Sequence, residues 1–148
     1  MAAIADFLSP ANVLAKVAAT DKDSLLRVLC QRAAGSVALP EASIAREMLK
    51  REALGSTGVG GGIALPHARM AGIARPFGLL AQLKKAIAFD AVDGRPVDIV
   101  FLLLLPAERE EESRNALASV ARKLRDPAVV GAIRAGRDDA SIYGAIAE

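Results

Sequence analysis

The run from Val97 to Leu105 constrains the fold of this chain more than any other segment. It contains Val, Ile, Leu and Phe almost without interruption, and Asp98 is its one charged residue. A strand with one face in water alternates apolar and polar residues, whereas a strand covered on both faces reads as a continuous apolar run. The run is too short for a membrane helix, which needs about 20 apolar residues. We therefore expect a central strand buried on both faces, in a protein that does not insert into membranes.

Two helices are expected before this strand. In the first, apolar residues recur at helical spacing, Asp21 or Asp23 can cap the start, and Gly35 marks the end. Pro40 suits the first turn of the second helix, which Gly55 would end. Because helices also follow the central strand, the order of elements indicates an α/β fold in a single domain over residues 1–148. The other predicted elements are strands at 63–65 and 77–83, a turn at 91–95, a helix that opens at the acidic residues 110–112 and ends before Asp126, and two helices at 128–135 and 139–146.

The single histidine, His67, and the single cysteine, Cys30, exclude several kinds of site. A zinc site takes about four ligands from Cys, His and carboxylates, so neither a metal site nor a cofactor is expected. A disulfide framework needs paired cysteines, and their absence favours a reduced, cytoplasmic protein. Near the N-terminus Asp6 comes early and Lys16 late, the reverse of the charge order in a secretory signal peptide.

Charge and aromatic content argue against nucleic acid as a partner. The chain has 19 Lys and Arg against 17 Asp and Glu, and the basic residues are scattered along it. Nucleic-acid binders concentrate Lys and Arg on one face, and those that bind single strands add stacking aromatic residues. Four Phe and one Tyr offer little to stack on, so we expect no nucleic-acid partner.

The segment from Arg51 to Arg69 contains the residues best suited to chemistry. Five of the eight residues from Gly55 to Gly62 are glycine, so this stretch cannot be a helix and is expected to be a loop with unusual backbone dihedrals. Small residues let backbone N–H groups approach an anion closely, and Ser56 and Thr57 add hydroxyl donors. Arg51 and Arg69 flank the loop with planar guanidinium groups that suit phosphate. The segment is therefore a candidate anion site.

Two nucleotide-binding patterns do not fit this loop. The Walker pattern needs a lysine followed by Ser or Thr, and no lysine occurs between Lys50 and Lys84. The dinucleotide pattern fails because Ile63 stands where its last glycine should be. A bound nucleotide is therefore not expected here.

His67 has two interpretations. A neutral imidazole is a good nucleophile near neutral pH and can carry a phosphoryl group covalently. The alternative is a structural histidine at a strand end, behind Pro66, with the glycines forming a tight connection. The glycines, hydroxyls and arginines around His67 favour the chemical role.

Several stretches of the chain together match a known pattern. They are Arg51-Glu52, Gly55-Ser56-Thr57-Gly58-Val59-Gly60, Gly62-Ile63-Ala64-Leu65-Pro66-His67, Ile87 to Asp98, Phe101 to Pro106 and the helix at 116–125. This pattern resembles the fructose/mannitol-type enzyme IIA domains of the sugar phosphotransferase system, and among them the nitrogen-regulatory branch. The resemblance covers most of the chain. It implies a mixed central β-sheet flanked by helices on both faces.

The resemblance also implies roles for individual residues. His67 would accept a phosphoryl group from an HPr-type histidine phosphocarrier protein, and Arg51 would neutralise the charge of the phosphate. The residues that would line the phosphate pocket are Ser56, Thr57, Gly58 and Gly60.

One departure from the family pattern concerns onward transfer. In many members a second histidine lies near the start of the helix after the long strand and faces the first. Ser113 takes this place here, with Asn115 close by. Ser113 could replace the second histidine as a hydrogen-bond donor, but it cannot bear a positive charge.

Three functions follow from these observations. The first is a phosphohistidine carrier whose phosphorylation state regulates target proteins. The second is a binding module that uses the same surface but transfers phosphate poorly. The third is a IIA subunit of a sugar-transport system that passes phosphate to an enzyme IIB.

Overall fold

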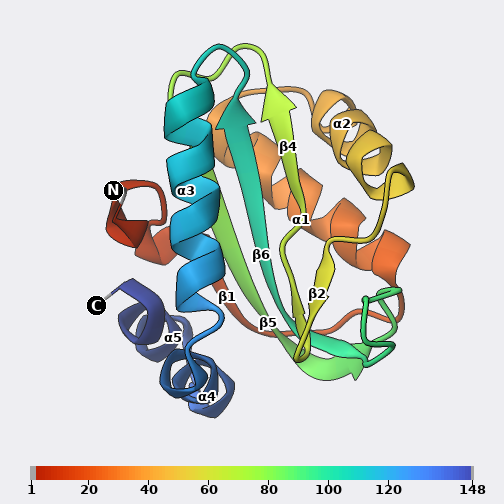
Figure 1. The fold of residues 1–148 in the computed structure, drawn as a ribbon, viewed down its shortest axis with the longest axis vertical. Helices are drawn as coiled ribbons and strands as arrows, with labels where there is room; N and C mark the ends of the chain where they lie inside the picture. Colours follow the sequence, from red (N-terminus) through yellow and green to blue (C-terminus); the bar gives the residue numbers. More distant parts are fainter. Residues whose placement is uncertain (1–2, 148) are drawn as a thin grey trace.

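β6 (Val97–Pro106) lies at the centre of a mixed six-stranded sheet (Figure 1). The structure, a computed structural model, describes residues 3–147. The strand order is β1-β5-β6-β3-β2, and β4 pairs with β6 beyond the end of β3. β5 and β6 are antiparallel, as are β2 and β3, while the other pairs are parallel. The remaining elements are β1 (Val13–Val17), β2 (Gly58–Gly60), β3 (Ile63–Ala64), β4 (His67–Met70), β5 (Phe77–Ile87), α1 (Lys22–Val37), α2 (Glu41–Ala53), α3 (Glu110–Lys123), α4 (Pro127–Ala135), α5 (Asp139–Ala147) and two 3-10 turns at Ile4–Asp6 and Pro10–Asn12.

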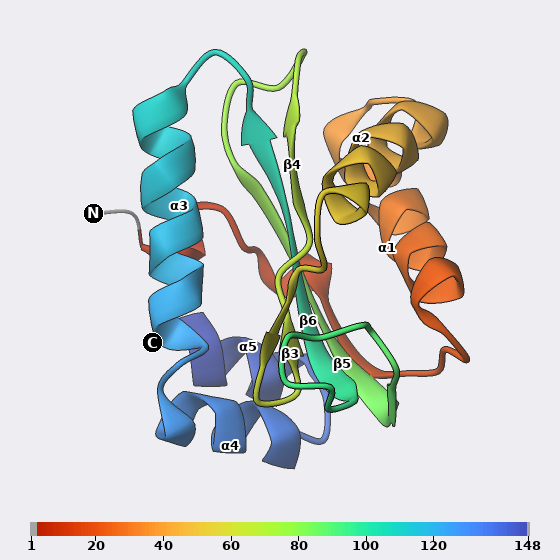
Figure 2. The same ribbon diagram turned by 45° about the vertical axis from the view of Figure 1, so that its right-hand side comes forward.

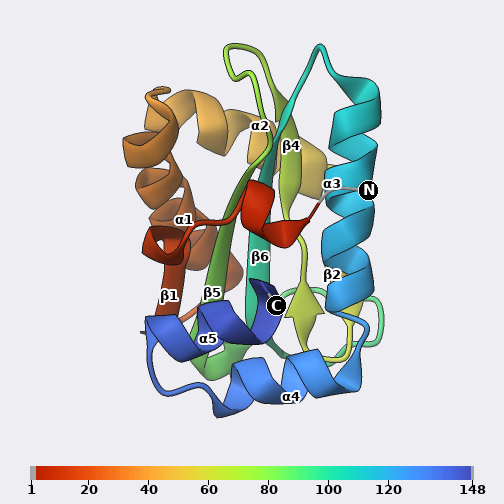
Figure 3. The same cartoon turned by 90° about the vertical axis from the view of Figure 1, so that its left-hand side faces the viewer.

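Helices cover both faces of the sheet (Figures 2 and 3). α1 and α2 pack on one face, and α3, α4 and α5 pack on the other. Successive side chains of β6 alternate between two apolar cores, so that Leu102 joins the α1/α2 core and Leu103 joins the core under α3. Every residue of β6 is buried except Asp98, which is half-buried. The predicted central strand and the mixed α/β fold are confirmed.

The start of α1 is confirmed, whereas its predicted end at Gly35 is wrong. The Asp21 carboxylate accepts a hydrogen bond from the backbone N–H of Ser24 at 2.8 Å and caps the helix. Gly35 lies inside the helix, which continues to Val37. The stop comes at Ala38, which adopts a left-handed conformation (φ 58°) and donates its N–H to the carbonyl of Ala34.

Three strands, β1, β2 and β4, have no counterpart among the predicted elements. β2 lies in the glycine-rich stretch that was expected to be a loop, so that expectation is wrong for residues 58–60. β1 is only five residues long and includes Lys16, and its residues are mostly half-buried at one edge of the sheet. β4 contains His67 and Arg69, which interrupt its apolar residues. Short strands of mixed polarity do not show the continuous apolar run that identifies β6.

No helix within residues 3–147 is long and apolar enough to cross a lipid bilayer.

Candidate functional site

His67 is the first residue of β4, where the edge of the sheet passes from β3 to β4. β3 and β4 pair with β6 in one continuous register, with Ala64 opposite Val100 and His67 opposite Leu103. The N–H of Leu103 donates to the carbonyl of Pro66 at 2.9 Å, so the chain stays attached to β6 through the proline. This attachment holds the backbone of His67 in place.

The side chain of His67 lies on the α3 side of the sheet. Ala68 belongs to the α1/α2 core, and neighbouring residues of a strand point to opposite faces. Arg69 shares the α3 side, because its Nη1 lies 3.1 Å from the Glu110 carboxylate at the start of α3. The sequence analysis expected the Arg69 guanidinium to be available to an anion. In the structure it forms an ion pair with Glu110 instead.

The imidazole of His67 is half-buried and makes one hydrogen bond, from Nδ1 to the carbonyl oxygen of Leu65 at 2.8 Å. Because a carbonyl only accepts, Nδ1 carries the proton and Nε2 keeps its lone pair. Burial of the ring lowers the pKa of His67 below its ordinary value of 6.5. The Leu65 carbonyl and the charge of Glu52 oppose this shift, and the charge of Arg51 adds to it. The ring is therefore neutral at neutral pH, with Nε2 available as a nucleophile.

Arg51 lies in the last turn of α2, close enough to His67 to influence the imidazole pKa. Its Nη1 donates to the carbonyl of Gly55 at 2.8 Å, across the end of the helix. A cation is favourable here because carbonyl groups without helical partners collect at a helix C-terminus. Arg51 and His67 thus lie within electrostatic reach of each other, and the role of Arg51 toward phosphate stays a prediction.

The hydroxyls of Ser56 and Thr57 are both bonded within the protein. Ser56 donates to the carbonyl of Phe89 at 2.8 Å and accepts from the N–H of Gly58 at 3.0 Å. Thr57 is 3% exposed and donates both its hydroxyl and its N–H to the Glu52 carboxylate. These bonds hold the loop that leads to β2. A direct role of the two hydroxyls toward phosphate stays a prediction.

The glycines of the loop divide between two places. Gly58 lies opposite Ala64, where a Cβ on Gly58 would come within 2.8 Å of the Ala91 side chain. Gly60 pairs with Ile63 at the other end of the β2–β3 hairpin and adopts a φ of 102°. Ile63 precedes His67 by four residues, which is about 13 Å along a strand. Gly58 thus pairs with the residue three positions before His67, and Gly60 with the residue four positions before it, at the turn of the hairpin. A role of the two glycines toward phosphate stays a prediction.

The turn of this hairpin is held from both sides. The N–H of Gly61 donates to the Asp93 carboxylate at 3.0 Å, and its carbonyl accepts from Nη2 of Arg134 at 2.7 Å. Arg134 in α4 also bonds both carboxylate oxygens of Asp98 at 2.9 Å. The glycines at 60–62 are therefore explained by a tethered turn.

Ser113 lies in the first turn of α3 and is 1% exposed. Its hydroxyl donates to the carbonyl of Pro106 at 3.1 Å, at the end of β6. This bond ties the start of α3 to the strand before it. The role of Ser113 as a replacement for a second histidine stays a prediction.

Sequence reasoning missed one pair of charged residues at the site. Nζ of Lys22, in the first turn of α1, lies 2.6 Å from the Glu52 carboxylate, whose side chain is 7% exposed. The same ammonium lies 4.7 Å from the centre of the Phe89 ring. Glu52 stands beside Arg51 in the segment that carries the resemblance, but no pattern in the sequence relates Glu52 to a lysine in an earlier helix.

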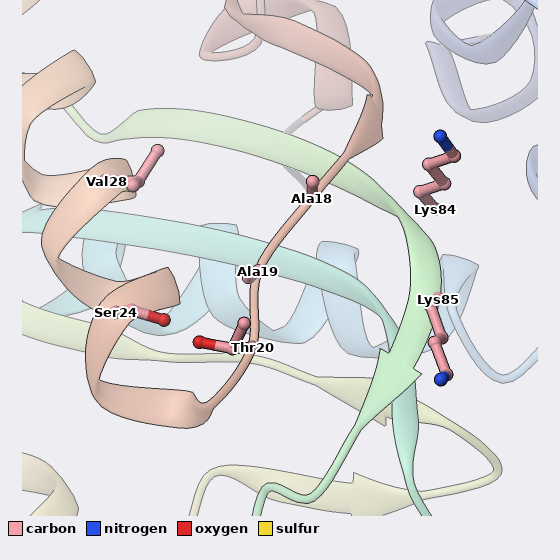
Figure 4. Close-up of a pocket in the computed structure, with 7 residues that line it drawn as sticks. All are labelled: Ala18, Ala19, Thr20, Ser24, Val28, Lys84 and Lys85. Atoms are coloured by element: carbon pink, nitrogen blue, oxygen red, sulfur yellow. The ribbon is translucent and has the colours of Figure 1, made fainter.

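Two further features of the described residues bear on other possible sites, the metal-binding side chains and the hollows. Among residues 3–147, no three His, Cys, Asp or Glu side chains lie close enough together to hold a metal ion. A hollow of about 730 Å³ lies at the β1 edge, away from His67, and is lined by residues of α1, of β5 and of the segment between β1 and α1 (Figure 4). The residues that line it are Ala18, Ala19, Thr20, Ser24, Val28, Lys84 and Lys85.

Comparison with known proteins identifies the family. Residues 6–148 match the family described as the phosphoenolpyruvate-dependent sugar phosphotransferase system, EIIA 2. The chain belongs to this family. It is 38% identical to a nitrogen regulatory protein of Bradyrhizobium diazoefficiens over 144 residues, which cover 97% of this chain and 94% of that protein. It is 36% identical to a nitrogen regulatory protein of Escherichia coli over 134 residues, which cover 90% and 82% of the two chains.

Solved structures of EIIA proteins share the fold. The nitrogen regulatory protein IIA-Ntr from Neisseria meningitidis superimposes with a TM-score of 0.91 at 26% identity, over 97% of this chain and 98% of that one. Mannitol enzyme IIA of Escherichia coli superimposes with a TM-score of 0.77 at 17% identity, over 95% and 99% of the two chains. The sequence-based resemblance is confirmed, and the chain is a phosphotransferase-system phosphocarrier of the nitrogen-regulatory branch.

Proposed function

We propose that this protein accepts a phosphoryl group on Nε2 of His67 from an HPr-type phosphocarrier, and that its phosphorylation state controls the binding of target proteins. The observation that carries the proposal is the hydrogen bond from Nδ1 of His67 to Leu65, in a chain of the EIIA 2 family. This bond leaves a lone pair on Nε2 of a neutral ring. We place the exchange in the cytoplasm, in line with the buried, unpaired thiol of Cys30.

In the proposed transfer, one bond forms and one breaks. The lone pair of His67 Nε2 attacks phosphorus, the N–P bond of the donor breaks, and its electron pair stays on the donor nitrogen. The ring of His67 gains positive charge as the new bond forms. Nδ1 keeps its proton and donates a hydrogen bond to the Leu65 carbonyl throughout, which stabilises that charge without any rearrangement.

Arg51 is proposed to stabilise the charge on the phosphoryl group as it arrives. Its guanidinium has five N–H donors, and the bond to Gly55 takes one of them. Positioned donors of this kind provide most of the catalysis in phosphoryl transfer, because the protein has little covalent chemistry to perform beyond the nucleophile. Ser56, Thr57 and Gly58 support the loop that places these groups.

Exposed apolar side chains around the loop support a protein partner. Leu54 follows α2 and is 86% exposed, and Val59 on β2 is 57% exposed. Val92 is 78% exposed, and its N–H donates to the carbonyl of Gly58. Exposed apolar residues that lie together mark surfaces that bind other proteins, and these three belong to the loop or to segments joined to it. Because a phosphate adds roughly two negative charges, its arrival would change which partner such a surface favours.

A second candidate function is a binding module that accepts phosphate poorly. The observation that favours it is Ser113, a buried serine bonded to Pro106 where many family members have a histidine. Both candidates use the same surface. They differ in whether phosphate reaches His67 at a useful rate.

One assay tests the proposed function. The purified protein is incubated with phosphoenolpyruvate, enzyme I and an HPr-type carrier, and its intact mass is measured. We expect an acid-labile gain of one phosphoryl group, about 80 Da, in the wild type and none in His67→Ala. No gain in the wild type, while the carrier itself is phosphorylated, would favour the binding module. Adding an enzyme IIB domain afterwards shows whether the phosphate is passed on.

A further inference from the structure

We propose that Glu52 is a positioning residue for His67 and acts through Thr57 and Leu65. The inference rests on the proposed function, because it concerns the residue that would accept phosphate. Lys22 pairs with the buried Glu52 carboxylate and holds it in place.

The Glu52 carboxylate is placed by two helices. Glu52 comes one residue before the end of α2, and Lys22 is the first residue of α1. Their charged groups lie 2.6 Å apart, with side-chain exposures of 7% and 18%. The ring of Phe89 lies 4.7 Å from the ammonium and shields this pair from one side. A carboxylate this deep in the protein requires a partner, and Lys22 meets that requirement.

A continuous series of hydrogen bonds links this carboxylate to the imidazole. Oε1 of Glu52 accepts from the Thr57 hydroxyl and, at 3.2 Å, from the Thr57 N–H. The carbonyl of Thr57 accepts from the N–H of Leu65 at 2.9 Å. The carbonyl of Leu65 in turn accepts from Nδ1 of His67 at 2.8 Å. Glu52 therefore adds a second support, from the α2 side, to the carbonyl that orients the imidazole, whose other support is the pairing with β6.

The position of the Leu65 carbonyl matters for the reaction and not only for stability. It selects the tautomer in which Nε2 has the lone pair, and it sets the direction in which Nε2 points. Small displacements of a reacting group are costly, since a shift of about 1 Å can slow a reaction roughly 100-fold. Loss of the Glu52–Thr57 bonds would let the loop move by such an amount.

The charges that face His67 come from two sides of the site. Arg51 and Glu52 at the end of α2 act on the imidazole with opposite signs. The Arg69–Glu110 pair lies on the α3 side. Removing Glu52 would therefore lower the pKa of His67 as well as free its ring.

The test compares Glu52→Ala and Glu52→Gln with the matched control Glu47→Ala, on the same helix, where the glutamate side chain is 31% exposed and pairs with Arg46 and Lys50. The tautomer of His67 is measured from the 15N shifts of the imidazole. The rate of phosphate acceptance is measured with a phosphorylated HPr-type carrier. In Glu52→Ala we expect a mixture of tautomers and a rate reduced 10- to 100-fold, roughly. Glu52→Gln keeps one acceptor oxygen for Thr57 and should recover most of the Nδ1–H form.

The proposal is overturned if folded Glu52→Ala keeps the wild-type tautomer and a rate within about twofold of Glu47→Ala. Should Glu52→Ala fail to fold, Thr57→Val removes the hydroxyl bond alone, with the exposed Thr20→Val as its control. An unchanged tautomer and rate in Thr57→Val would then overturn it. The tautomer is measured in the unphosphorylated protein, so its outcome does not depend on the proposed function. If the wild-type protein accepts no phosphate, the proposed function is contradicted. A change of tautomer in Glu52→Ala would still support the role of Glu52 in orienting His67.

Discussion

Nδ1 of His67 lies 2.8 Å from the carbonyl oxygen of Leu65, two residues earlier in the chain. The acceptor that orients the imidazole is thus part of the same edge segment, and the orientation exists before any partner binds. Because the backbone on either side of Pro66 is attached to β6, the carbonyl cannot turn away easily. The single imidazole of the chain is therefore held with Nε2 ready to react.

We expect the rate of phosphate acceptance to fall at acidic pH with a midpoint below 6.5. Burial lowers the pKa of His67 from that value, and only the neutral ring has a lone pair on Nε2. A depressed pKa means that the neutral ring is favoured in the folded state. Its contribution to stability is complete above pH 6.5 and is lost as the pH falls through the folded pKa. An NMR titration of the ring protons measures this pKa, and a midpoint above 6.5 would contradict the account.

Replacing Arg51 by alanine should slow phosphate acceptance by roughly 100-fold, because a charge-stabilising donor is lost. Arg51→Lys should recover part of the rate, since it keeps the charge but not the planar fork. The fold should persist, because the Arg51 side chain is half-buried and donates its hydrogen bond to a single backbone carbonyl, that of Gly55. Rates are compared with Arg46→Ala, an exposed arginine on the same helix. Equal rates of phosphate acceptance in Arg51→Ala and Arg46→Ala would show that Arg51 does not take part in the transfer.

Ser113→Ala should lower stability and leave phosphate acceptance almost unchanged. The buried hydroxyl donates to the carbonyl of Pro106, and losing that bond costs about 1 kcal/mol. Thermal unfolding measures the first effect and the phosphorylation assay the second. A clear drop in rate without loss of stability would instead give Ser113 the role that the family assigns to its second histidine.

Gly62→Ala should destabilise the protein more than Gly61→Ala. Both glycines have positive φ, 82° and 67°, so each alanine carries a cost of about 1–3 kcal/mol. At Gly62 the new Cβ would also lie 2.5 Å from Nη2 of Arg134 and 2.9 Å from Asp98, whereas at Gly61 it meets open space. Urea unfolding of the two variants measures the difference. Equal free energies of unfolding would show that the Arg134 contact does not restrain the turn.

The central part of the fold could be predicted from the sequence because its signals are local. The continuous apolar run of β6 indicates that the strand is buried on both faces. Asp21 and Asp126-Pro127 mark the starts of α1 and α4 with residues that are typical of helix N-termini. β1 and β4 could not be found in this way. Their place in the sheet depends on pairing with β5 and β6, which are distant in the chain.

The candidate site was predictable to a similar extent. His67, Arg51 and the glycine loop stand close together in the sequence, and their chemistry could be read there. The separation of Gly60 from His67 depends on the hairpin register, which a run of glycines does not reveal. The pairing of Lys22 with Glu52 depends on how α1 and α2 pack. Contacts of that kind follow from tertiary structure alone.

The central claim is that His67 accepts phosphate through Nε2 while Nδ1 stays bonded to Leu65. The most direct test is an NMR measurement of 15N–31P coupling in the phosphorylated, 15N-labelled protein. The account predicts coupling to Nε2 of His67, with the proton retained on Nδ1. Coupling to Nδ1, or phosphate on any other residue, would contradict it.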